Sequence, residues 1–230
     1  SEEKGDGYTV ELGDQKVDVR PWPFVTPGEK PEFTHDPHVW TDVKQADVQV
    51  FNIGTALEKT QSDNPAAADS IKAAVEKYEA QLTLLDQWVR DSISSVPEED
   101  RVLFTSHDAF GYFANAYDVK FIGAALSDFN HQQDATAEHI NKAAEEVKAS
   151  GAKALFAENS NNSKSIEAIA RAAGVEAITN DDALYGDSLG PAGSAGETYI
   201  GSIIHNVTTL VTAWGGKPAS LPQEISDYAK

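Results

Sequence analysis

The stretch Val102-Leu103-Phe104-Thr105-Ser106-His107-Asp108 decides the fold, because the periodicity of the chain changes at this point. Its first four residues form a short apolar run of the kind found in strands that are buried on both faces. Three more such runs follow, at residues 121–126, 154–157 and 175–178, and helical segments separate them. The alternation predicts an α/β fold with a four-stranded parallel sheet, right-handed crossovers and flanking helices.

The segments between these strands carry helix signals. Helices are predicted over residues 108–117, 136–150, 163–173 and 198–214. Gly151 and Gly174 directly follow two of them, as is typical of helix C-termini. A glycine-rich loop over residues 186–196 precedes the last helix.

Upstream of the sheet the sequence predicts one long helix, about residues 65–95. Pro65 suits its first turn and Asn64 can cap it. Apolar residues recur at alternating steps of four and three, which marks one buried stripe; they are Ile71, Val75, Tyr78, Leu82, Leu85, Val89 and Ile93. At about 1.5 Å per residue the helix would span roughly 45 Å, long enough to act as a strut.

The N-terminal part is less regular. Residues 1–36 predict irregular structure, with a short hairpin around Gly13-Asp14 and an extended loop over residues 21–31. Residues 38–59 predict a helix. Its expected buried stripe consists of Val43, Ala46, Val50, Ile53 and Leu57.

Composition limits the function classes. The net charge is −19, from 37 acidic and 18 basic residues, which disfavours nucleic acid and anionic membranes as partners. No apolar run reaches the roughly 20 residues of a membrane helix, and no signal-peptide pattern opens the chain. Cysteine is absent, so disulfides, thiolate metal sites and cysteine nucleophiles are excluded. Methionine is absent even at position 1, which we interpret as a mature chain or a fragment.

Three segments carry residues that suit a metal ion. His107 directly follows the first strand and Asp182 follows the fourth, so both fall on the edge formed by the carboxyl ends of the strands. In Asp36-Pro37-His38-Val39-Trp40, the proline fixes the backbone before His38, and the tryptophan can pack. Imidazole and carboxylate ligands suit zinc and tolerate manganese or iron. We predict that His38, His107 and Asp182 converge on one divalent metal ion.

Other side chains compete for these roles. Asp181 is the neighbour of Asp182, and either of them could instead be a loop acid or a helix cap. His35 could chelate together with His38 only in a helix, which Pro37 disfavours. His131 lies on a polar loop after the second strand and could reach the same edge.

Glu158 ends the third strand and also faces this edge, where it could orient a histidine. His139 and His205 fall within predicted helices, and we interpret them as surface or packing residues. No Gly-x-Ser-x-Gly elbow, phosphate-binding loop or His-Glu-x-x-His motif is present.

The motifs together resemble a known family. Residues 36–40, with Asn52-Ile53, Ala56-Leu57 and Asp63-x-Pro65-Ala66 after them, resemble the solute-binding proteins of zinc and manganese ABC transporters, which are periplasmic or lipoprotein receptors. Three later stretches are similar to further motifs of that family, and the order and spacing agree over about residues 36–214. These stretches are residues 105–113, Phe156-Ala157-Glu158 and Asp182-Ala183-Leu184.

The resemblance implies two α/β lobes joined by a rigid helix, with the metal between them. By motif, His38 takes the second ligand position, His107 the third and Asp182 the fourth. Histidine at the third position resembles the zinc-preferring or broad-specificity members. The family's usual Asp-Pro-Leu-Gly is replaced here by Asp182-Ala183-Leu184-Tyr185-Gly186.

The family's first ligand lies in an N-terminal lobe that is largely absent from this sequence. The expected division of the chain is an irregular or hairpin segment, a remnant of that lobe with the Asp-Pro-His motif, a long linker helix and a C-terminal α/β lobe. Their bounds are residues 1–36, 37–64, 65–97 and 98–230.

The implied function is non-enzymatic. The chain would bind Zn²⁺, with Mn²⁺ as the alternative, in the periplasm or at the bacterial cell surface and deliver it to the permease of an ABC importer. It would reach the membrane only through that permease or through a lipid anchor on an upstream cysteine that this sequence lacks. Two alternatives are a cell-surface adhesion or scaffold module that keeps the fold, and a zinc hydrolase with Glu158 as general base.

Overall fold

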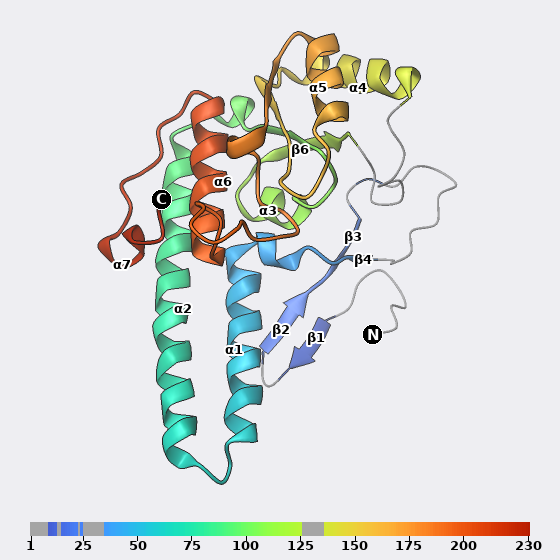
Figure 1. The fold of residues 1–230 in the computed structure, drawn as a ribbon. Helices are drawn as coiled ribbons and strands as arrows, with labels where there is room; N and C mark the ends of the chain where they lie inside the picture. The colour runs from blue at the N-terminus through green and yellow to red at the C-terminus, as the bar shows by residue number, and fades with distance from the viewer. Residues whose placement is uncertain (1–8, 13–14, 23, 25–34, 126–135) are drawn as a thin grey trace.

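A computed structural model describes residues 9–12, 15–22, 24, 35–125 and 136–230. Two long helices, α1 (Val43–Thr60) and α2 (Pro65–Ser94), lie side by side and project below a lobe that contains the parallel sheet and the other helices (Figure 1). The short hairpin of β1 (Thr9–Leu12) and β2 (Gln15–Asp18) lies beside α1. The predicted turn at Gly13-Asp14, most of the predicted loop over residues 21–31 and the candidate ligand His131 lie outside the described residues.

The sheet of the lobe has four parallel strands in the order β6-β5-β7-β8, which confirms the predicted fold class. The strands are β5 (Val102–Thr105), β6 (Lys120–Ala124), β7 (Ala154–Phe156) and β8 (Glu176–Ile178). The chain runs from β5 outward to β6 and then returns to the other side of β5 with β7. The order therefore reverses between β5 and β7, and ligands bind at such points in parallel sheets.

Helices cover both faces of this sheet. They are α3 (Gly111–Ala116), α4 (Ala137–Ser150), α5 (Lys164–Ala173) and α6 (Tyr199–Ala213). The short α7 (Gln223–Ser226), which the sequence did not predict, lies beside α2 (Figure 1). Alternate strand residues point to opposite faces. Leu103 and Phe156 accordingly join a core with α2, α3 and α6, whereas Phe104 and Leu155 join a second core with α4 and α5. Strands buried on both faces explain the continuous apolar runs in the sequence.

The long predicted helix is α2 (Pro65–Ser94), capped by the Asn64 side chain. Only the second half of its stripe, from Leu82 to Ile93, is fully buried, because that half packs inside the lobe. Ile71, Val75 and Tyr78 in the first half are partly exposed, since this half lies along α1.

Helix α1 spans Val43–Thr60, after the short 3-10 helix η1 (Val39–Thr41), and Asp42 caps it. The predicted stripe on α1 was wrong at its end: Ile53 is 58% exposed and Leu57 is 48% exposed. Gly54 faces α2 instead, because a Cβ atom at this position would lie only 2.5 Å from Cγ2 of Val75. The two helices thus approach each other at a glycine, and the neighbouring isoleucine turns outward.

The N-terminal segment forms two small antiparallel sheets. β1 (Thr9–Leu12) pairs with β2 (Gln15–Asp18), which confirms the predicted hairpin, and β3 (Arg20–Pro21) pairs with β4 (His35–Asp36). Tyr112 of α3 connects β3 and β4 to the lobe. Its hydroxyl accepts the Arg20 N–H at 2.7 Å and donates to the carbonyl of Asp36 at 2.8 Å.

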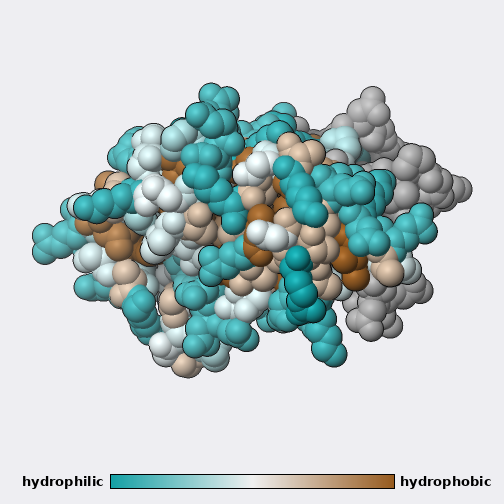
Figure 2. All heavy atoms as spheres, turned by 90° about the horizontal axis from the view of Figure 1, so that it is seen from above, coloured by the Kyte–Doolittle hydropathy of each residue, from teal (hydrophilic) through white to brown (hydrophobic). Residues whose placement is uncertain are grey.

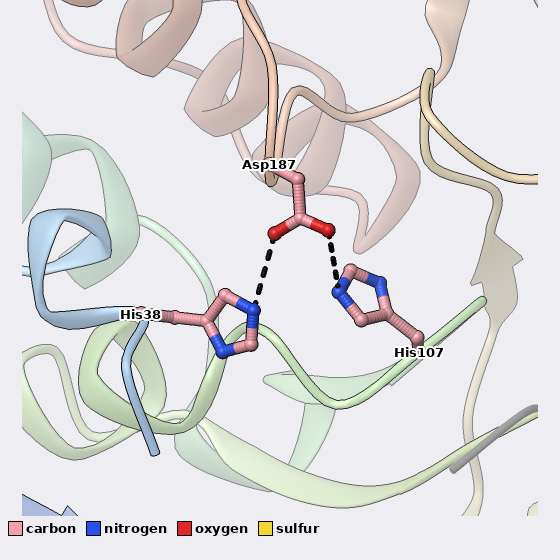
Figure 3. Close-up of side chains that lie close together, drawn as sticks. All are labelled: His38, His107 and Asp187. Carbon is pink, nitrogen blue, oxygen red and sulfur yellow. Dashed lines mark ion pairs between the residues drawn. The ribbon is translucent and has the colours of Figure 1, made fainter. Parts of the chain in front are cut away.

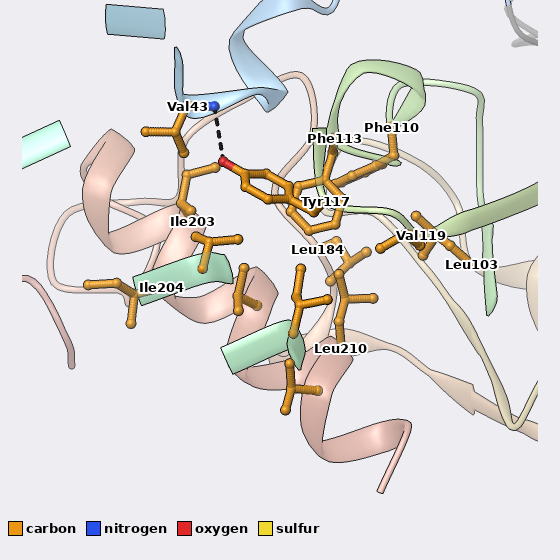
Figure 4. Close-up of a cluster of buried hydrophobic side chains, with 14 of the residues drawn as sticks. Val43, Leu103, Phe110, Phe113, Tyr117, Val119, Leu184, Ile203, Ile204 and Leu210 are labelled. Atoms are coloured by element: carbon orange, nitrogen blue, oxygen red, sulfur yellow. Dashed lines mark hydrogen bonds between the residues drawn. The ribbon is translucent and has the colours of Figure 1, made fainter. Parts of the chain in front are cut away.

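A buried polar group joins α1, α2 and α3. The Tyr117 hydroxyl accepts the Val43 N–H at 3.4 Å and donates to Oδ1 of Asp86 at 3.0 Å, in the middle of the apolar cluster of Figure 4. Arg90 donates to both Asp86 oxygens, at 3.0 and 3.1 Å, so this buried carboxylate has a cationic partner. Burial raises the pKa of the Tyr117 hydroxyl, which therefore stays protonated and remains a donor. These bonds fix the start of α1 relative to the lobe.

Most of the face seen from above is hydrophilic, with apolar side chains scattered over it (Figure 2). This agrees with the net charge of −19. Among the described residues, no helix is long and apolar enough to cross a membrane.

Leu85→Ala tests the packing of α2 in the core. Leu85 is fully buried, so we expect its truncation to lower the free energy of unfolding by about 2–5 kcal/mol. Leu57→Ala is the matched control, because Leu57 also lies on a long helix but is exposed, and we expect a change within about 0.5 kcal/mol. Urea unfolding of the metal-free protein measures both. Equal losses for the two variants would contradict this account of the core.

Candidate metal centre

His38 is held by its own short segment. Asp36 accepts the His38 backbone N–H at 2.9 Å, and the same oxygen lies 2.6 Å from Nδ1 of the His38 ring. The Thr41 hydroxyl donates to the His38 carbonyl at 2.9 Å, which closes the turn that begins η1. The backbone and Nδ1 are thus fixed locally, and Nε2 is directed toward the edge of the sheet.

His107 follows β5 at the carboxyl edge of the sheet and is completely buried. Its backbone N–H donates to Oε1 of Glu158 at 3.0 Å, and its Nδ1 lies 2.6 Å from Oε2 of Glu158. Glu158 follows β7, the strand that pairs with β5, so the sheet itself brings the two side chains together. Contact between Glu158 and a histidine agrees with the expectation from the end of the third strand.

The third member of the centre is Asp187. One oxygen of its carboxylate lies 3.1 Å from Nε2 of His38 and the other lies 3.0 Å from Nε2 of His107 (Figure 3). One ligand atom from each residue lies within 4.8 Å of the others. The two imidazole nitrogens therefore approach the two oxygens of one carboxylate.

The two nitrogen-to-oxygen separations are compatible with a divalent metal ion held between the rings and Asp187. Ligand atoms about 2.0–2.1 Å from Zn²⁺ at the tetrahedral angle would lie roughly 3.3 Å apart, close to the observed nitrogen-to-oxygen distances. Each ring also contacts a carboxylate through Nδ1, an arrangement that commonly orients metal-binding histidines. With three protein ligands, a tetrahedral ion keeps one further position.

The structure brings His38 and His107 together but does not bring Asp182 to them. Asp182 ends the 3-10 helix η3 (Asn180–Asp182), and its side chain is exposed. The next residues continue beside β7: the Leu184 N–H donates to the Ala157 carbonyl at 2.9 Å. This extra pairing carries the chain onward, so the acid that reaches the histidines comes after the bridge, at Asp187.

The sequence contains a signal for Asp187. Asp187-Ser188-Leu189-Gly190 keeps the spacing of the Asp-Pro-Leu-Gly pattern, whereas Asp182-Ala183-Leu184-Tyr185-Gly186 contains one additional residue. Asp182 was predicted because it directly follows the fourth strand.

The loop that carries Asp187 is fixed from α6. The Tyr185 N–H donates to the side-chain oxygen of Asn206, and the Asn206 amide donates to the Tyr185 carbonyl, both at 2.8 Å. Gly186 lies against the other side of the centre, because a Cβ atom there would be 2.6 Å from Oε2 of Glu158. Glycine at this position permits the close approach of the loop to the Glu158 carboxylate.

The remaining candidates lie elsewhere. His35 is buried in β4 and does not belong to the group of ligand atoms. Asp181 is exposed in η3, His139 is exposed in the first turn of α4, and His205 approaches the Ala183 carbonyl at 3.0 Å through Nε2.

The charges of the centre reinforce one another. Burial lowers the pKa of His38, but its contacts with Asp187 and Asp36 outweigh burial and raise the pKa to about 9. His107 behaves in the same way: burial is outweighed by Asp187 and Glu158, which raise its pKa to about 11. Burial raises the pKa of Asp187, but the two histidines outweigh it and hold the pKa well below its usual range. Without a metal ion, the raised pKa values favour protonated rings, whose positive charges face the carboxylates of Asp36, Asp187 and Glu158.

Comparison with known proteins identifies the family of this chain. The family model described as "ZnuA: Zinc-uptake complex component A periplasmic" matches residues 2–213. The zinc-binding protein TroA of Treponema pallidum (strain Nichols) is 35% identical over 187 residues, which cover 80% of this chain and 58% of that protein. The manganese-binding lipoprotein MntA of Bacillus subtilis (strain 168) is 33% identical over 182 residues, covering 78% of this chain and 58% of that protein.

Solved structures agree with the fold. The periplasmic zinc-binding protein TroA from Treponema pallidum superposes with a TM-score of 0.68 and 30% identity, over 81% of this chain and 66% of that one. Fe(III)-bound YtgA from Chlamydia trachomatis gives a TM-score of 0.71 at 21% identity, over 84% of this chain and 68% of that one, a likeness of fold alone. The chain spans 58% of the length of these two curated relatives. Because the family model matches nearly all of its residues, the chain belongs to the ZnuA family of periplasmic zinc-uptake components.

Proposed function

We propose that this chain is the metal-binding part of an extracytoplasmic receptor that captures a divalent ion for an ABC importer. One observation carries the proposal: Nε2 of His38 and Nε2 of His107 approach the same carboxylate, that of Asp187. The curated relatives are named as metal-binding proteins and as substrate-binding lipoproteins of metal ABC transporters, which supports the role of the ion as cargo.

Zinc is the proposed ion, with manganese as the alternative. Two of the three candidate ligand atoms are imidazole nitrogens, and nitrogen-rich sites favour zinc over manganese, which prefers oxygen ligands. Relatives named for zinc and for manganese, and a structure named for Fe(III), all share this fold, so the fold alone does not select the ion.

The contacts of Glu158 favour binding over hydrolysis. A general base must reach a metal-bound water, but both Glu158 oxygens contact His107, one at its backbone N–H and one at Nδ1. Glu158 therefore acts as a support for His107. In this role the ion would be held and released unchanged, and the partner would be the permease of the importer.

The division of the chain into four parts belongs to the same proposal. Residues 1–36 and 37–64 would belong to the N-terminal side of the receptor, residues 65–97 to the linker helix and residues 98–230 to the C-terminal lobe. The centre would then lie between the two sides, because His38 comes from the first and His107 and Asp187 come from the second.

Titration calorimetry of the chelator-treated chain with Zn²⁺ and Mn²⁺ tests the function directly. We expect His107→Ala to lower the zinc affinity at least about tenfold, because one of three ligands is lost. His139→Ala is the matched control, since His139 is exposed on α4 away from the centre, and it should leave the affinity unchanged. Absence of zinc binding to the parent chain, or equal affinities for the two variants, would remove the proposal.

The pair Asp187→Asn and Asp182→Asn tests which acid binds the ion. Both substitutions remove one negative charge from the same loop region while keeping side-chain size. We expect Asp187→Asn to weaken zinc binding at least about tenfold, because a neutral amide is a poor ligand for zinc, and Asp182→Asn to change it less than about twofold. If Asp182→Asn had the larger effect in the same calorimetric titration, the ligand set would revert to the one predicted from sequence.

Protons and the metal ion compete for the same nitrogen atoms. A histidine must lose its Nε2 proton to bind zinc, so the raised pKa values of His38 and His107 oppose binding at low pH. The same protons stabilise the metal-free fold. A raised folded-state pKa contributes stability that is complete below the unfolded pKa, about 6.5, and is lost as pH rises through the folded value.

We therefore expect opposite pH trends for the two states. Between pH 6.5 and about 9, where His38 titrates, the metal-free chain should become less stable to urea while its zinc affinity increases. Asp187→Asn should flatten the stability trend, because Asp187 contacts both histidines. Urea unfolding at several pH values, with chelator present, measures it. A metal-free stability that increases over this range would contradict the assigned contacts.

A further inference from the structure

Trp40 joins two of the segments that carry the proposed ligands. Its indole Nε1 donates to the carbonyl of Gly186 at 2.9 Å. Trp40 lies in η1 just after His38, and Gly186 directly precedes Asp187. The bond therefore ties the backbone beside one ligand to the segment that supplies another.

A second contact holds the other side of Asp187. The Asn159 side-chain amide donates to the Ser188 carbonyl at 3.2 Å and to the Ser188 hydroxyl at 2.9 Å. Asn159 follows Glu158, the acid that contacts His107. Trp40 thus binds the residue before Asp187, and Asn159 binds the residue after it. Trp40 is close in sequence to His38, and Asn159 is next to the acid that contacts His107.

Trp40 is itself well placed to act as a fixed anchor. The Tyr199 hydroxyl, from the first residue of α6, donates to the Trp40 carbonyl at 2.8 Å, and the indole ring packs edge-on against the His38 ring at 5.4 Å. Asp187, in contrast, has a side chain that is 37% exposed. The carboxylate depends on backbone contacts of its loop more than on packing for its position.

We propose that Trp40, assisted by Asn159, is a positioning residue that locks the Asp187 loop onto the two histidines and thereby sets the rate at which the metal ion leaves. When the loop opens, the ion keeps two imidazole ligands and loses the carboxylate, so dissociation proceeds from the open loop. This inference rests on the proposed function, with Asp187 as a ligand. Among mutants of one interface, differences in affinity lie mainly in the dissociation rate. The contacts of Trp40 and Asn159 with the Asp187 loop, which we call the latch, should act on this rate.

Trp88 provides a matched control. Its indole Nε1 also donates to a backbone carbonyl at 2.9 Å, that of Ala219, but Trp88 lies on α2 and none of the proposed ligands is involved. Trp88→Phe and Trp40→Phe both remove one indole hydrogen bond and keep an aromatic ring. Only the bond of Trp40 connects to the loop of Asp187.

The first experiment measures zinc release by stopped-flow mixing of the zinc-loaded chain with an excess of a chromogenic chelator. Losing one hydrogen bond should make Trp40→Phe release zinc about threefold to tenfold faster than the parent, with an association rate within about twofold. Trp88→Phe should match the parent in both rates. A Trp40→Phe release rate equal to that of the parent, or an equal acceleration in Trp88→Phe, would overturn the proposal.

A second variant, at an exposed residue, guards against a folding defect in Trp40→Phe. A second measurement, on the metal-free chain, does not depend on metal binding. Asn159 is exposed, so Asn159→Ala leaves the core intact and should accelerate zinc release about twofold to fivefold. Hydrogen exchange of the metal-free chain follows the loop without an ion: residues 185–190 should exchange faster in Trp40→Phe and not in Trp88→Phe.

These readouts separate the two proposals. If the parent chain does not bind zinc, the metal-binding function fails and the proposed control of metal release fails with it; faster exchange of residues 185–190 in Trp40→Phe would then show only that Trp40 positions the loop. If the parent binds zinc, and neither release nor exchange changes in Trp40→Phe and Asn159→Ala, the latch fails and the metal-binding function stands.

Discussion

The contact between His107 and Glu158 is the interaction on which the rest of the centre depends. Both side chains are buried, and a buried polar or charged group that loses a partner is costly. Removing one member of a buried pair therefore lowers the free energy of unfolding by more than the intact pair adds to it. The parallel pairing of β5 with β7 makes this contact possible, because it places the residues after both strands at the same edge.

The second requirement is a fixed relation between the start of α1 and the lobe. This relation is fixed by hydrogen bonds among Tyr117, Asp86 and Arg90, which link the Val43 amide to α2 and α3. These polar groups are surrounded by apolar side chains and have few other hydrogen-bond partners. His38 lies just before this point in the chain. The same network that stabilises the junction of the helices thus sets the distance between the two imidazoles, whose ring centroids lie 5.4 Å apart.

Sequence patterns predicted the features that depend on local chemistry. Apolar runs gave the four strands, Gly151 and Gly174 end helices with left-handed φ values of 76° and 78°, and the strand-end rule located His107. Sequence and structure differ where tertiary contacts decide. The structure brings Asp187 to the histidines and not the predicted Asp182, because the pairing of Leu184 beside β7, which leaves no periodic signal, carries the chain onward. Ile53 was expected to be buried because a stripe cannot reveal that Gly54 makes the helix contact.

The candidate ligands come from three segments that are distant in the chain: one before α1, one after β5 and one after β8. A partly folded chain that has formed only one of these regions offers a single imidazole or carboxylate, which binds an ion weakly. Zinc would therefore bind almost exclusively to chains that have completed the tertiary fold, and by mass action it would add about 2.7 kcal/mol to their stability at a free concentration 100 times the Kd. The ion would select for correctly assembled molecules, so the loaded population would also be the one most resistant to proteolysis.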